Sequence, residues 1–357
     1  MKTLSLRAGS AAMHKSDQQS KIGANLITNL SAHLRSPASP SPPTCLNHPF
    51  NSVLDSVLLS GINSVLLSPA MSPFPLSGLA DEAADDIDGQ IAAHQALGWK
   101  ALELRLLNGK QFSGPAVSDD EFKQAVEKIE AAGMRVSSYA SAIGNWSRPI
   151  SGDFAVDLAD LKVLIPRMQR TGTKFVRTMS WVRGDVSEDI WRDEGVRRYK
   201  EMAKLAADGG IMLLHENCEG WGGLSGTHAR RFIESVGHPS VRYLFDIGNT
   251  VSYGQETMPF YRDILPYVEY VHIKDCRRNP AGGKSSAFTY AGEGDALVRE
   301  ILTDLIRKGY KAGVSIEPHV ASIVHLGEGT KASPQERFDS YVRYGKGLEK
   351  LLTEITA

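Results

Sequence analysis

The sequence predicts an α/β fold, a (β/α)8 TIM barrel, with a disordered or poorly ordered N-terminal extension before it. From Leu76 onward, short apolar or β-branched segments alternate with amphipathic segments. This alternation is typical of strand–helix–strand units built around a parallel sheet. Residues 71–357 hold eight such strands, each followed by a helix. A domain of that length is close to the roughly 250 residues typical of this barrel.

The expected strands are short and rich in apolar or β-branched residues: Leu76–Asp81, Ala101–Arg105, Arg135–Ala140, Phe175–Ser180, Ile211–Asn217, Val241–Asp246, Tyr270–Lys274 and Val314–Glu317. The expected helices between and after them include Ile87–Leu97, Asp119–Ala132, Val156–Arg170, Gly195–Asp208, His228–Val236, Leu297–Lys308 and Pro334–Thr353. Glycine, which readily adopts positive φ, is expected to end six helices, at Gly98, Gly133, Gly172, Gly209, Gly237 and Gly309. A doubly wound open sheet is the alternative, but no Gly-x-Gly-x-x-Gly segment follows any expected strand.

Residues 1–70 differ in composition from the rest of the chain. They are rich in Ser and Pro, and residues 36–43 read Ser-Pro-Ala-Ser-Pro-Ser-Pro-Pro, which cannot sustain a helix or a sheet. An apolar run from Val53 to Leu67 has helical spacing but starts too late for a secretory peptide. Three explanations stay open: a transit-like presequence, an added docking helix, or a start assigned upstream of Met71, which we favour.

Composition limits the classes of function. The chain has 40 Lys and Arg against 41 Asp and Glu, whereas a protein that binds duplex DNA concentrates basic residues. Cys45, Cys218 and Cys276 form no Cys-x-x-Cys pair, which favours a reducing, cytoplasmic location. No uninterrupted apolar run reaches the roughly 18 residues of a spanning helix. We expect neither nucleic acid nor membrane as partner, and a homo-oligomer stays open.

Polar residues gather where the last four expected strands end: His-Glu-Asn at 215–217, Asp-Ile-Gly-Asn at 246–249, His-Ile-Lys-Asp at 272–275 and Glu-Pro-His at 317–319. In a β/α barrel the loops after the carboxyl ends of the strands build the site, so these residues are expected to meet on one rim. Buried carboxylates cost several kcal/mol unless they are paired or bound to a metal.

Three carboxylates and one imidazole on one rim indicate a divalent cation, held by Glu216, Asp246, His272 and Glu317. Without a cation, mutual repulsion would raise the pKa values of the carboxyl groups. Oxygen donors with one imidazole nitrogen favour Mn²⁺, Mg²⁺ or Co²⁺, and Zn²⁺ is also compatible. Such a site leaves coordination positions for two substrate oxygens.

Seven fragments occur in a recognisable order at the strand ends: Asp-Glu at 81–82, Glu-Leu-Arg at 103–105, His-Glu-Asn at 215–217, Phe-Asp-Ile-Gly-Asn at 245–249, His-Ile-Lys-Asp at 272–275, Gly-Glu-Gly-Asp at 292–295 and Ser-Ile-Glu-Pro-His at 315–319. With them, residues 76–350 resemble the xylose-isomerase-like barrels, which include sugar-phosphate isomerases and epimerases, ketose 3-epimerases and inosose dehydratases. The resemblance implies that the four residues named above are metal ligands, and that Glu216 and Glu317 also transfer protons. It implies that Arg278, six residues after His272, holds substrate hydroxyls.

Two departures from related proteins limit what the resemblance implies. Ketose epimerases carry a His three residues after the Asp of strand six, where this chain has Asn249, which can bind a hydroxyl but cannot share a proton. The related AP endonucleases bind three zinc ions through His residues on strands two and three, where this chain has Arg105 and no His. A DNA-repair function is therefore not expected.

Substrate contacts are expected from Asn249, Arg278, Lys274, Glu103, Arg105, Trp221 and His319. Some of these residues have a structural alternative. Glu103 and Arg105 share a strand face and can form a buried ion pair instead, and Lys274 can pair with Asp275 or with Glu103. Trp221 either stacks on a sugar ring or packs its Gly-rich loop. Of the remaining candidates, Trp146 and Trp181 are expected to form site walls, and His215 is expected to be structural.

The predicted function is that of a divalent-metal-dependent isomerase or epimerase of a sugar, sugar phosphate or polyol. The cation would polarise the substrate carbonyl and acidify the neighbouring C–H. One of the carboxylates Glu216 and Glu317 would remove that proton and the other return it, through a metal-bound enediolate. Loss of a β-hydroxyl from the same enediolate would give dehydration. The alternatives are therefore an inosose-type dehydratase and a non-catalytic sugar-binding barrel.

Overall fold

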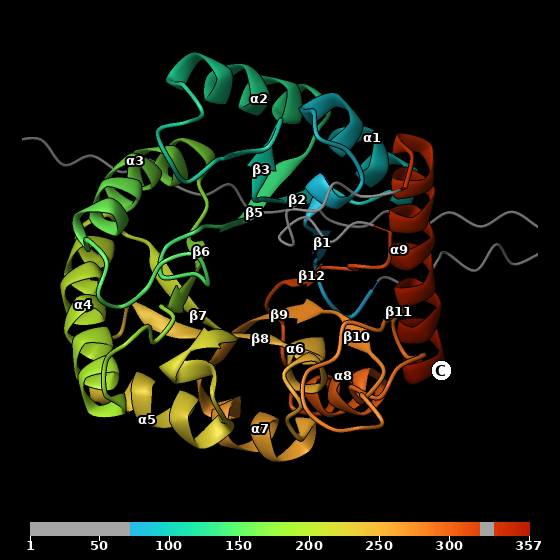
Figure 1. The fold of residues 1–357 in the computed structure, drawn as a ribbon. Coiled ribbons are helices and arrows are strands. Elements are labelled where there is room, and N and C mark those ends of the chain that lie inside the picture. Colours follow the sequence, from blue (N-terminus) through green and yellow to red (C-terminus); the bar gives the residue numbers. More distant parts are fainter. Residues whose placement is uncertain (1–71, 322–331) are drawn as a thin grey trace, which may run out of the picture. The chain divides into compact units, whose positions relative to one another are not determined.

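The structure, a computed structural model, describes residues 72–321 and 332–357. Within these ranges eight parallel strands form a sheet in the order β1-β12-β9-β8-β7-β6-β5-β2. A bridge between Leu79 and Glu103 joins the end of β1 to β2 and closes the ring. Figure 1 shows this barrel with the helices arranged around it. The prediction of a (β/α)8 barrel is confirmed, and the predictions for residues 1–70 fall outside the described ranges.

All eight barrel strands lie where the sequence predicts them, with shifts at the ends of some. Their bounds are β1 Leu76–Gly78, β2 Ala101–Leu104, β5 Arg135–Ala140, β6 Phe175–Ser180, β7 Met212–Gly220, β8 Val241–Asp246, β9 Val268–Ile273 and β12 Val314–Ile316. Two short antiparallel pairs lie in the loops after β2 and β9: β3 Leu106–Leu107 with β4 Lys110–Gln111, and β10 Asp275–Cys276 with β11 Phe288–Thr289.

The described helices are α1 Ile87–Leu97, α2 Asp119–Ala131, α3 Ala155–Thr171, α4 Glu188–Asp208, α5 Gly226–Val236, α6 Ile247–Ser252, α7 Thr257–Ile264, α8 Val298–Arg307 and α9 Pro334–Thr356, with 3-10 turns η1 Ala80–Glu82, η2 Trp221–Gly223 and η3 Leu265–Tyr267. The sequence analysis specified no helix between β8 and β9. Both helices found there, α6 and α7, are too short to show a clear helical period.

The helix ends follow from local chemistry. Capping boxes start α2 and α9, where Ser118 and Ser333 each accept a hydrogen bond from the backbone N–H of a Glu three residues later. Five of the six predicted glycines adopt positive φ, but Gly209 does not. Its φ is −79°, and the next residue, Gly210, takes the left-handed conformation at +69°. The prediction for Gly209 was therefore wrong by one residue, because the chain stays close to helical geometry through Gly209 before it turns.

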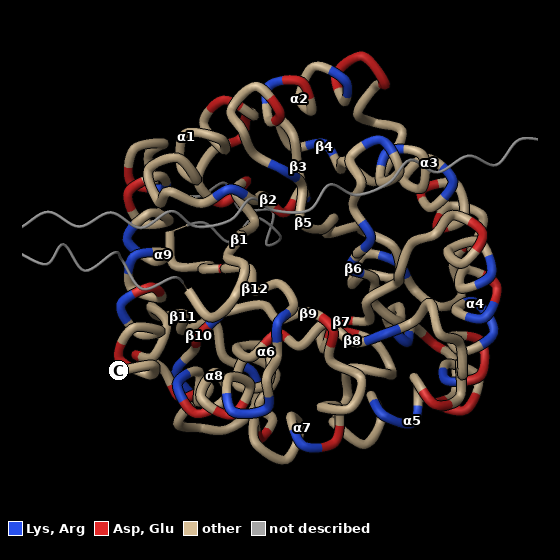
Figure 2. The backbone as a smooth tube through the Cα atoms, turned by 180° about the vertical axis from the view of Figure 1, so that it is seen from behind, with Lys and Arg blue, Asp and Glu red and all other residues tan. Residues whose placement is uncertain are grey.

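The apolar core has two parts. The larger part lies between the sheet and the surrounding helices, where α9 packs against both α1 and α8. The smaller part consists of Leu214, Leu244 and Tyr270, with Phe175 and Met212 packed against it. Figure 2 shows Lys, Arg, Asp and Glu interspersed over the helices around the barrel. No helix among the described residues combines the length and apolarity needed to cross a membrane.

Side chains inside the barrel form successive layers, because alternate residues of a strand face the same side. The apolar layer includes Phe175, Leu214, Leu244 and Tyr270. Two residues further along the same four strands come Arg177, Glu216, Asp246 and His272, which are all buried. Two residues further again, Met179, Cys218 and Lys274 line a cavity. The strands therefore place a charged layer directly between an apolar plug and an open pocket.

Candidate metal centre

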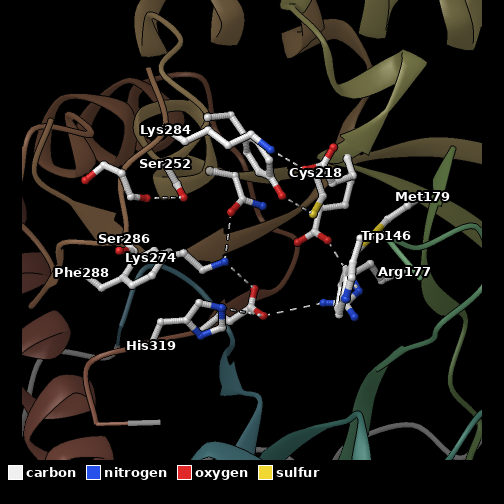
Figure 3. A pocket seen from close by; sticks show the side chains of 16 residues that line it. Trp146, Arg177, Met179, Cys218, Ser252, Lys274, Lys284, Ser286, Phe288 and His319 are labelled. Atoms are coloured by element: carbon white, nitrogen blue, oxygen red, sulfur yellow. Dashed lines mark hydrogen bonds and ion pairs between the residues drawn. The ribbon is translucent and has the colours of Figure 1, made fainter. Parts of the chain in front are cut away.

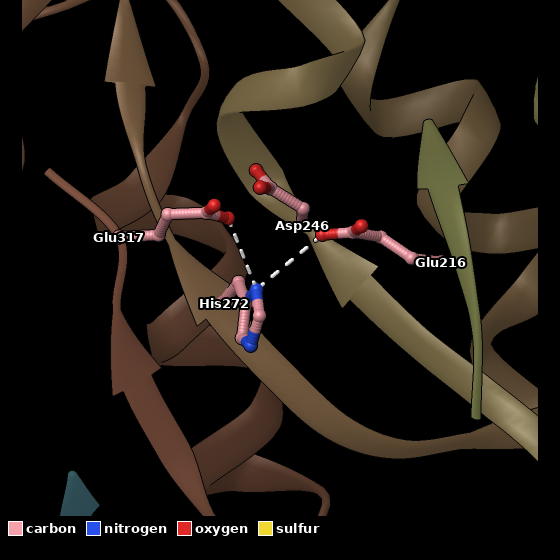
Figure 4. Close-up of side chains that lie close together, drawn as sticks. All are labelled: Glu216, Asp246, His272 and Glu317. Atoms are coloured by element: carbon pink, nitrogen blue, oxygen red, sulfur yellow. Dashed lines mark hydrogen bonds and ion pairs between the residues drawn. The ribbon is translucent and has the colours of Figure 1, made fainter. Parts of the chain in front are cut away.

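All four predicted ligands converge at the carboxyl ends of neighbouring strands. Glu216 of β7, Asp246 of β8, His272 of β9 and Glu317 after β12 each offer one donor atom, and these atoms all lie within 4.8 Å of one another. Figure 4 shows the three carboxylates and the imidazole pointing toward one another. All four residues are at most 3% exposed. This geometry matches a mixed oxygen and nitrogen donor set for a divalent cation.

Asp246 is positioned by its neighbours along the chain and across the sheet. Its backbone N–H donates to Oδ1 of Asn217 at 2.8 Å, and its carbonyl accepts from Nδ2 of Asn217 at 2.7 Å. Its Oδ1 accepts from the backbone N–H of Asn249 at 2.9 Å and so caps α6. The second oxygen, Oδ2, is left facing Lys274 at 2.7 Å. Asp246 is thus both a helix cap and a member of the centre.

His272 is held by a carboxylate on the far side of the ring from the cluster. Its Nε2 lies 3.0 Å from Oε2 of Glu103, whereas its Nδ1 lies 3.2 Å from Oε2 of Glu317 and 3.4 Å from Oε1 of Glu216. Burial lowers the pKa of His272, but the three carboxylates outweigh it and raise that pKa well above its usual value. A carboxylate that fixes one imidazole nitrogen and leaves the other for a metal is a common arrangement in metal sites.

The charges around the centre do not balance without a cation. The described side chains supply three buried cations, Arg105, Arg177 and Lys274, and the protonated His272 makes a fourth. Six buried carboxylates face them: Asp81, Glu82, Glu103, Glu216, Asp246 and Glu317. Burial, offset in part by Lys274, raises the pKa of Asp246 to about 7, and burial raises that of Glu82 to about 7 despite Arg105. Oε1 of Glu216 accepts no hydrogen bond from a described residue. The residues present therefore fit a divalent cation.

Lys274 and Arg105 bridge carboxylates of the centre. Lys274 Nζ lies 2.7 Å from Asp246 and 3.1 Å from Glu317. The sequence analysis offered Asp275 or Glu103 as its structural partner, and both suggestions were wrong. Asp275 instead accepts backbone N–H groups, including those of Gly292 and Gly294 at 2.9 Å, and Glu103 is committed to His272.

Arg105 forms buried ion pairs, but its partner is not Glu103, so the predicted Glu103–Arg105 pair was wrong. Its Nε, Nη1 and Nη2 reach Asp81 at 2.7 Å, Glu317 at 2.7 Å and Glu82 at 3.3 Å. Glu82, Glu317 and His319 form a second set of donor atoms close to one another. The guanidinium of Arg105 already contacts both carboxylates of this set, so it supplies their positive charge.

A cavity of about 370 Å³ opens above the charged layer (Figure 3). Glu216, Glu317, Lys274, Asn249 and His319 line its polar side. The remaining lining includes apolar and aromatic side chains, namely Trp146, Met179, Tyr253 and Phe288. Lys284 and Glu219 also line the cavity and form an ion pair of 2.6 Å. A cavity that combines apolar and aromatic walls with converging polar groups is typical of a small-molecule site.

Most of the other residues that the sequence singled out lie away from the cavity lining. Glu103 and Arg105 sit behind it in ion pairs, and Arg278 pairs with Glu256 at 3.1 Å. Trp221 packs against His228 at a centroid distance of 4.8 Å. Trp146 lines the cavity as expected of a site wall, but Trp181 is fully buried and its Nε1 donates to Asp157.

His215 lies in the core outside the cavity lining, as a structural residue would. Its ring is in contact with those of Tyr199, Phe232 and Tyr243. The side chain has no solvent exposure, and burial lowers its pKa to about 3. His215 is therefore neutral at ordinary pH and belongs to the packing between the sheet and the helices.

The sequence analysis missed Arg177. This residue lies in the middle of β6, is 2% exposed and lines the cavity beside Glu216 and Glu317. A signal was present in the sequence, because a charged residue interrupts the apolar strand Phe-Val-Arg-Thr-Met-Ser two positions after Phe175. The predicted ligands are polar residues at the ends of strands five to eight, whereas Arg177 lies inside strand four.

A ring of eight parallel strands with a carboxylate-rich centre at their carboxyl ends defines an α/β-barrel protein of the kind that carries enzyme sites at that position. The family model of the xylose isomerase-like TIM barrel matches residues 91–340. The chain belongs to this family, as the sequence resemblance implied. The relatives and neighbours found include isomerase-like proteins, epimerases and dehydratases.

The curated relatives are inosose dehydratases. That of Bacillus anthracis is 26% identical over 128 residues, which span 32% of this chain and 43% of that enzyme. The chain therefore aligns with less than half of the length of the curated relatives that it matches.

Solved structures resemble most of the described barrel. A xylose isomerase-like TIM barrel protein from Mycobacterium smegmatis in complex with magnesium has a TM-score of 0.59 and 21% identity, covering 80% of this chain and 98% of its own. The IOLI protein with a bound zinc atom has a TM-score of 0.63 and 14% identity, covering 78% and 98%. The 3-keto-D-glucoside 4-epimerase from E. coli has a TM-score of 0.55 and 15% identity, covering 79% and 99%. At such identities these likenesses support the fold alone.

Proposed function

We propose that the protein is a divalent-metal-dependent isomerase or epimerase that acts on a small sugar or polyol by proton transfer. The observation that carries this proposal is the convergence of Glu216, Asp246, His272 and Glu317 directly beneath a cavity. The magnesium complex of one structural neighbour and the zinc atom bound to another support a divalent cation here. When bound by these four residues, the cation would polarise a substrate carbonyl and acidify the adjoining C–H.

Glu216 and Glu317 are the proposed proton-transfer groups, because both line the cavity and both belong to the donor cluster. Burial raises the pKa of Glu317, but Lys274 and the neighbouring His and Arg residues hold it well below its usual value. Burial likewise raises the pKa of Glu216, but Arg177 and His272 together outweigh burial, so that this pKa is lowered. Both carboxylates are therefore ionised and able to accept a proton from carbon. One removes it and the other returns it to the opposite face or to the adjacent carbon.

Lys274 and Asn249 are the proposed groups that orient substrate oxygens. Lys274 Nζ donates to Oδ1 of Asn249 at 3.1 Å, and both side chains face the cavity. The remaining hydrogen-bonding capacity of the amide and ammonium groups suits hydroxyl and carbonyl oxygens. The mixed wall of Trp146 and Phe288 suits the C–H face of a sugar or polyol.

A dehydratase is the second candidate function. The segment similarity to inosose dehydratases favours it. Both reactions begin with the same proton abstraction beside a carbonyl and differ in whether a β-hydroxyl then leaves. Reprotonation regenerates a sugar or polyol, whereas loss of hydroxide gives an unsaturated ketone and water.

The test uses the purified full chain, stripped with EDTA and then given Mn²⁺, Co²⁺, Mg²⁺ or Zn²⁺. Free ketoses, their phosphate esters and inososes are incubated with it in D₂O and followed by NMR. Metal-dependent deuterium incorporation at the carbon beside the carbonyl is expected. Recovery of an epimer or isomer supports the first function, and recovery of an unsaturated ketone supports the second. Probe binding without exchange under any metal overturns both and leaves a sugar-binding barrel.

A cytoplasmic location and the oligomeric state stay predictions from the sequence. Fractionation of the cells that produce the protein tests the first. Light scattering of the purified chain tests the second.

A further inference from the structure

We propose that Arg177 is a substrate-binding residue of this site, whose Nε–H donates to a neutral carbonyl or hydroxyl oxygen of the substrate. This inference rests on the proposed function, because it requires a substrate in the cavity beside Glu216 and Glu317. Three observations support this inference. The buried Nε–H donates no hydrogen bond, the guanidinium is held in place by contacts that leave this donor available, and the charges around it favour a neutral oxygen over an anionic group.

The first support is the unused donor. Arg177 is 2% exposed, and its Nε–H donates no hydrogen bond to any described residue. Arg177 also lines the cavity (Figure 3). A buried N–H without a partner is unfavourable, and a ligand oxygen in the adjoining cavity would satisfy it. Arg105 shows the contrast, because its Nε, Nη1 and Nη2 all reach carboxylates.

The second support is how the guanidinium is held. Nε lies 3.6 Å from Oε2 of Glu216, and Nη1 lies 3.7 Å from Oε1 of Glu317. At these distances the two carboxylates attract the guanidinium, but the atoms are too far apart for hydrogen bonds. Nη2 donates at 3.4 Å to the carbonyl oxygen of Ser141, the residue directly after the neighbouring strand β5. The guanidinium is therefore fixed between the two proposed proton-transfer groups with its Nε–H still available.

The third support concerns the chemistry of the ligand. A guanidinium has donors and no acceptor, so its partner must be an oxygen acceptor. An anionic group at this position would lie next to the carboxylates of both Glu216 and Glu317, and like charges at such distances repel strongly in a buried site. A neutral carbonyl or hydroxyl oxygen avoids this repulsion. Arg177 thus places a donor where the oxygen of a reacting ketone or polyol would lie between the two carboxylates.

The test compares Arg177→Lys and Arg177→Gln with a matched control, Arg167→Lys. Arg167 is also buried and also leaves its Nε without a described partner. It lies outside the cavity lining, however, and donates to the backbone carbonyls of Phe112, Gly114 and Val117. Lys at position 177 keeps the positive charge between the carboxylates but lacks the Nε–H of the planar fork.

The readouts are the deuterium-exchange kinetics of an inosose or free ketose probe, the affinity for Mn²⁺ by calorimetry and the melting temperature. Both Arg177 variants are expected to lower kcat/KM about 10- to 100-fold, the usual effect of losing one charged hydrogen bond. Mn²⁺ affinity is expected to change less than about threefold in Arg177→Lys. Arg167→Lys is expected to lower the melting temperature and leave kcat/KM unchanged. In a third variant, Arg177→Ala, which removes the side chain beyond Cβ, added guanidinium is expected to restore part of the activity.

Two outcomes overturn the assignment of Arg177. One is a kcat/KM within about threefold of wild type in the folded Arg177→Lys variant. The other is a fall in Mn²⁺ affinity as large as the fall in activity, which would show that Arg177 only supports the carboxylates. If the wild-type chain exchanges no probe with any metal, the proposed function fails instead. Arg177 is then judged by calorimetric binding of the same probes, which must weaken in the Arg177 variants and not in Arg167→Lys.

Discussion

Glu103 and His272 are separated by 169 residues in the chain, yet Oε2 of the first lies 3.0 Å from Nε2 of the second in a site without solvent exposure. The two side chains come from β2 and β9, and the contact crosses the interior of the barrel. Because Glu103 fixes one nitrogen of the imidazole, the other nitrogen faces Glu216 and Glu317. The contact therefore sets the direction of the one nitrogen donor of the candidate metal centre.

We predict that Glu103→Gln lowers the affinity for Mn²⁺ about 10- to 100-fold, the usual effect of losing a carboxylate behind a metal-binding His. The amide removes the charge that orients and polarises the imidazole but keeps the size of the side chain. Calorimetric titration of the EDTA-treated protein measures the change. Glu130→Gln, which alters an exposed ion pair with Arg170, serves as the control and is expected to bind Mn²⁺ like wild type. Equal affinities in the two variants would contradict the orienting role of Glu103.

We predict that Glu317→Gln lowers the rate of deuterium exchange about 10²- to 10⁴-fold, the range typical of losing a general acid or base. The amide cannot accept a proton from carbon, although it can still bind a hydroxyl or an ammonium group. Probe binding, measured by calorimetry in excess metal, is expected to persist. A variant that exchanges as fast as wild type would remove Glu317 from the reaction.

We predict that Gly248→Ala impairs both exchange and stability. An added Cβ at Gly248 would lie 2.7 Å from backbone and side-chain atoms of Lys274, so Lys274 would have to move away from Asp246 and Glu317. Gly347→Ala is the control, because a Cβ there meets no atom within 4 Å. That control lies inside α9, where Ala is expected to stabilise the helix by about 0.5–1 kcal/mol. Unchanged kinetics in Gly248→Ala would show that the position of Lys274 is not critical.

We predict that His215 makes the protein less stable in acid. Burial lowers its pKa in the folded state to about 3, below the roughly 6.5 of an unfolded chain. The unfolded state therefore binds the additional proton, and stability is lost as the pH falls below about 6.5. The contribution between pH 7 and pH 5 is about 2 kcal/mol. Urea unfolding measures the free energy of unfolding at the two pH values. Between pH 7 and pH 5, His215→Leu is expected to lose about 2 kcal/mol less of that free energy than wild type. An identical loss in the variant and in wild type would contradict this account.

The strands and the four candidate ligands could be predicted from the sequence for a simple physical reason. The carboxyl ends of parallel strands in a barrel meet on one rim, so polar residues that end strands five to eight have to be neighbours. The alternation of apolar strands and amphipathic helices places those strand ends along the chain. The contacts among the charged side chains could not be derived in the same way. The sequence offered several carboxylates as possible partners of Lys274, and only the structure shows that it pairs with Asp246 and Glu317.

The sequence by itself determined the barrel and the rim on which its polar residues gather, because both follow from local periodicity and from where each strand ends. Only the tertiary structure decided which charged groups face one another across the interior. That choice depends on the stagger between strands: Arg177 pairs in register with Leu214, yet its Nε lies 3.6 Å from Oε2 of Glu216, two residues further along β7. In the folded barrel, Glu103 lies behind His272, and Arg177 lies beside the cavity. Each of these pairings affects stability, because a buried charge without a partner is unfavourable. The partners come from different strands, so no single segment of the chain supplies them.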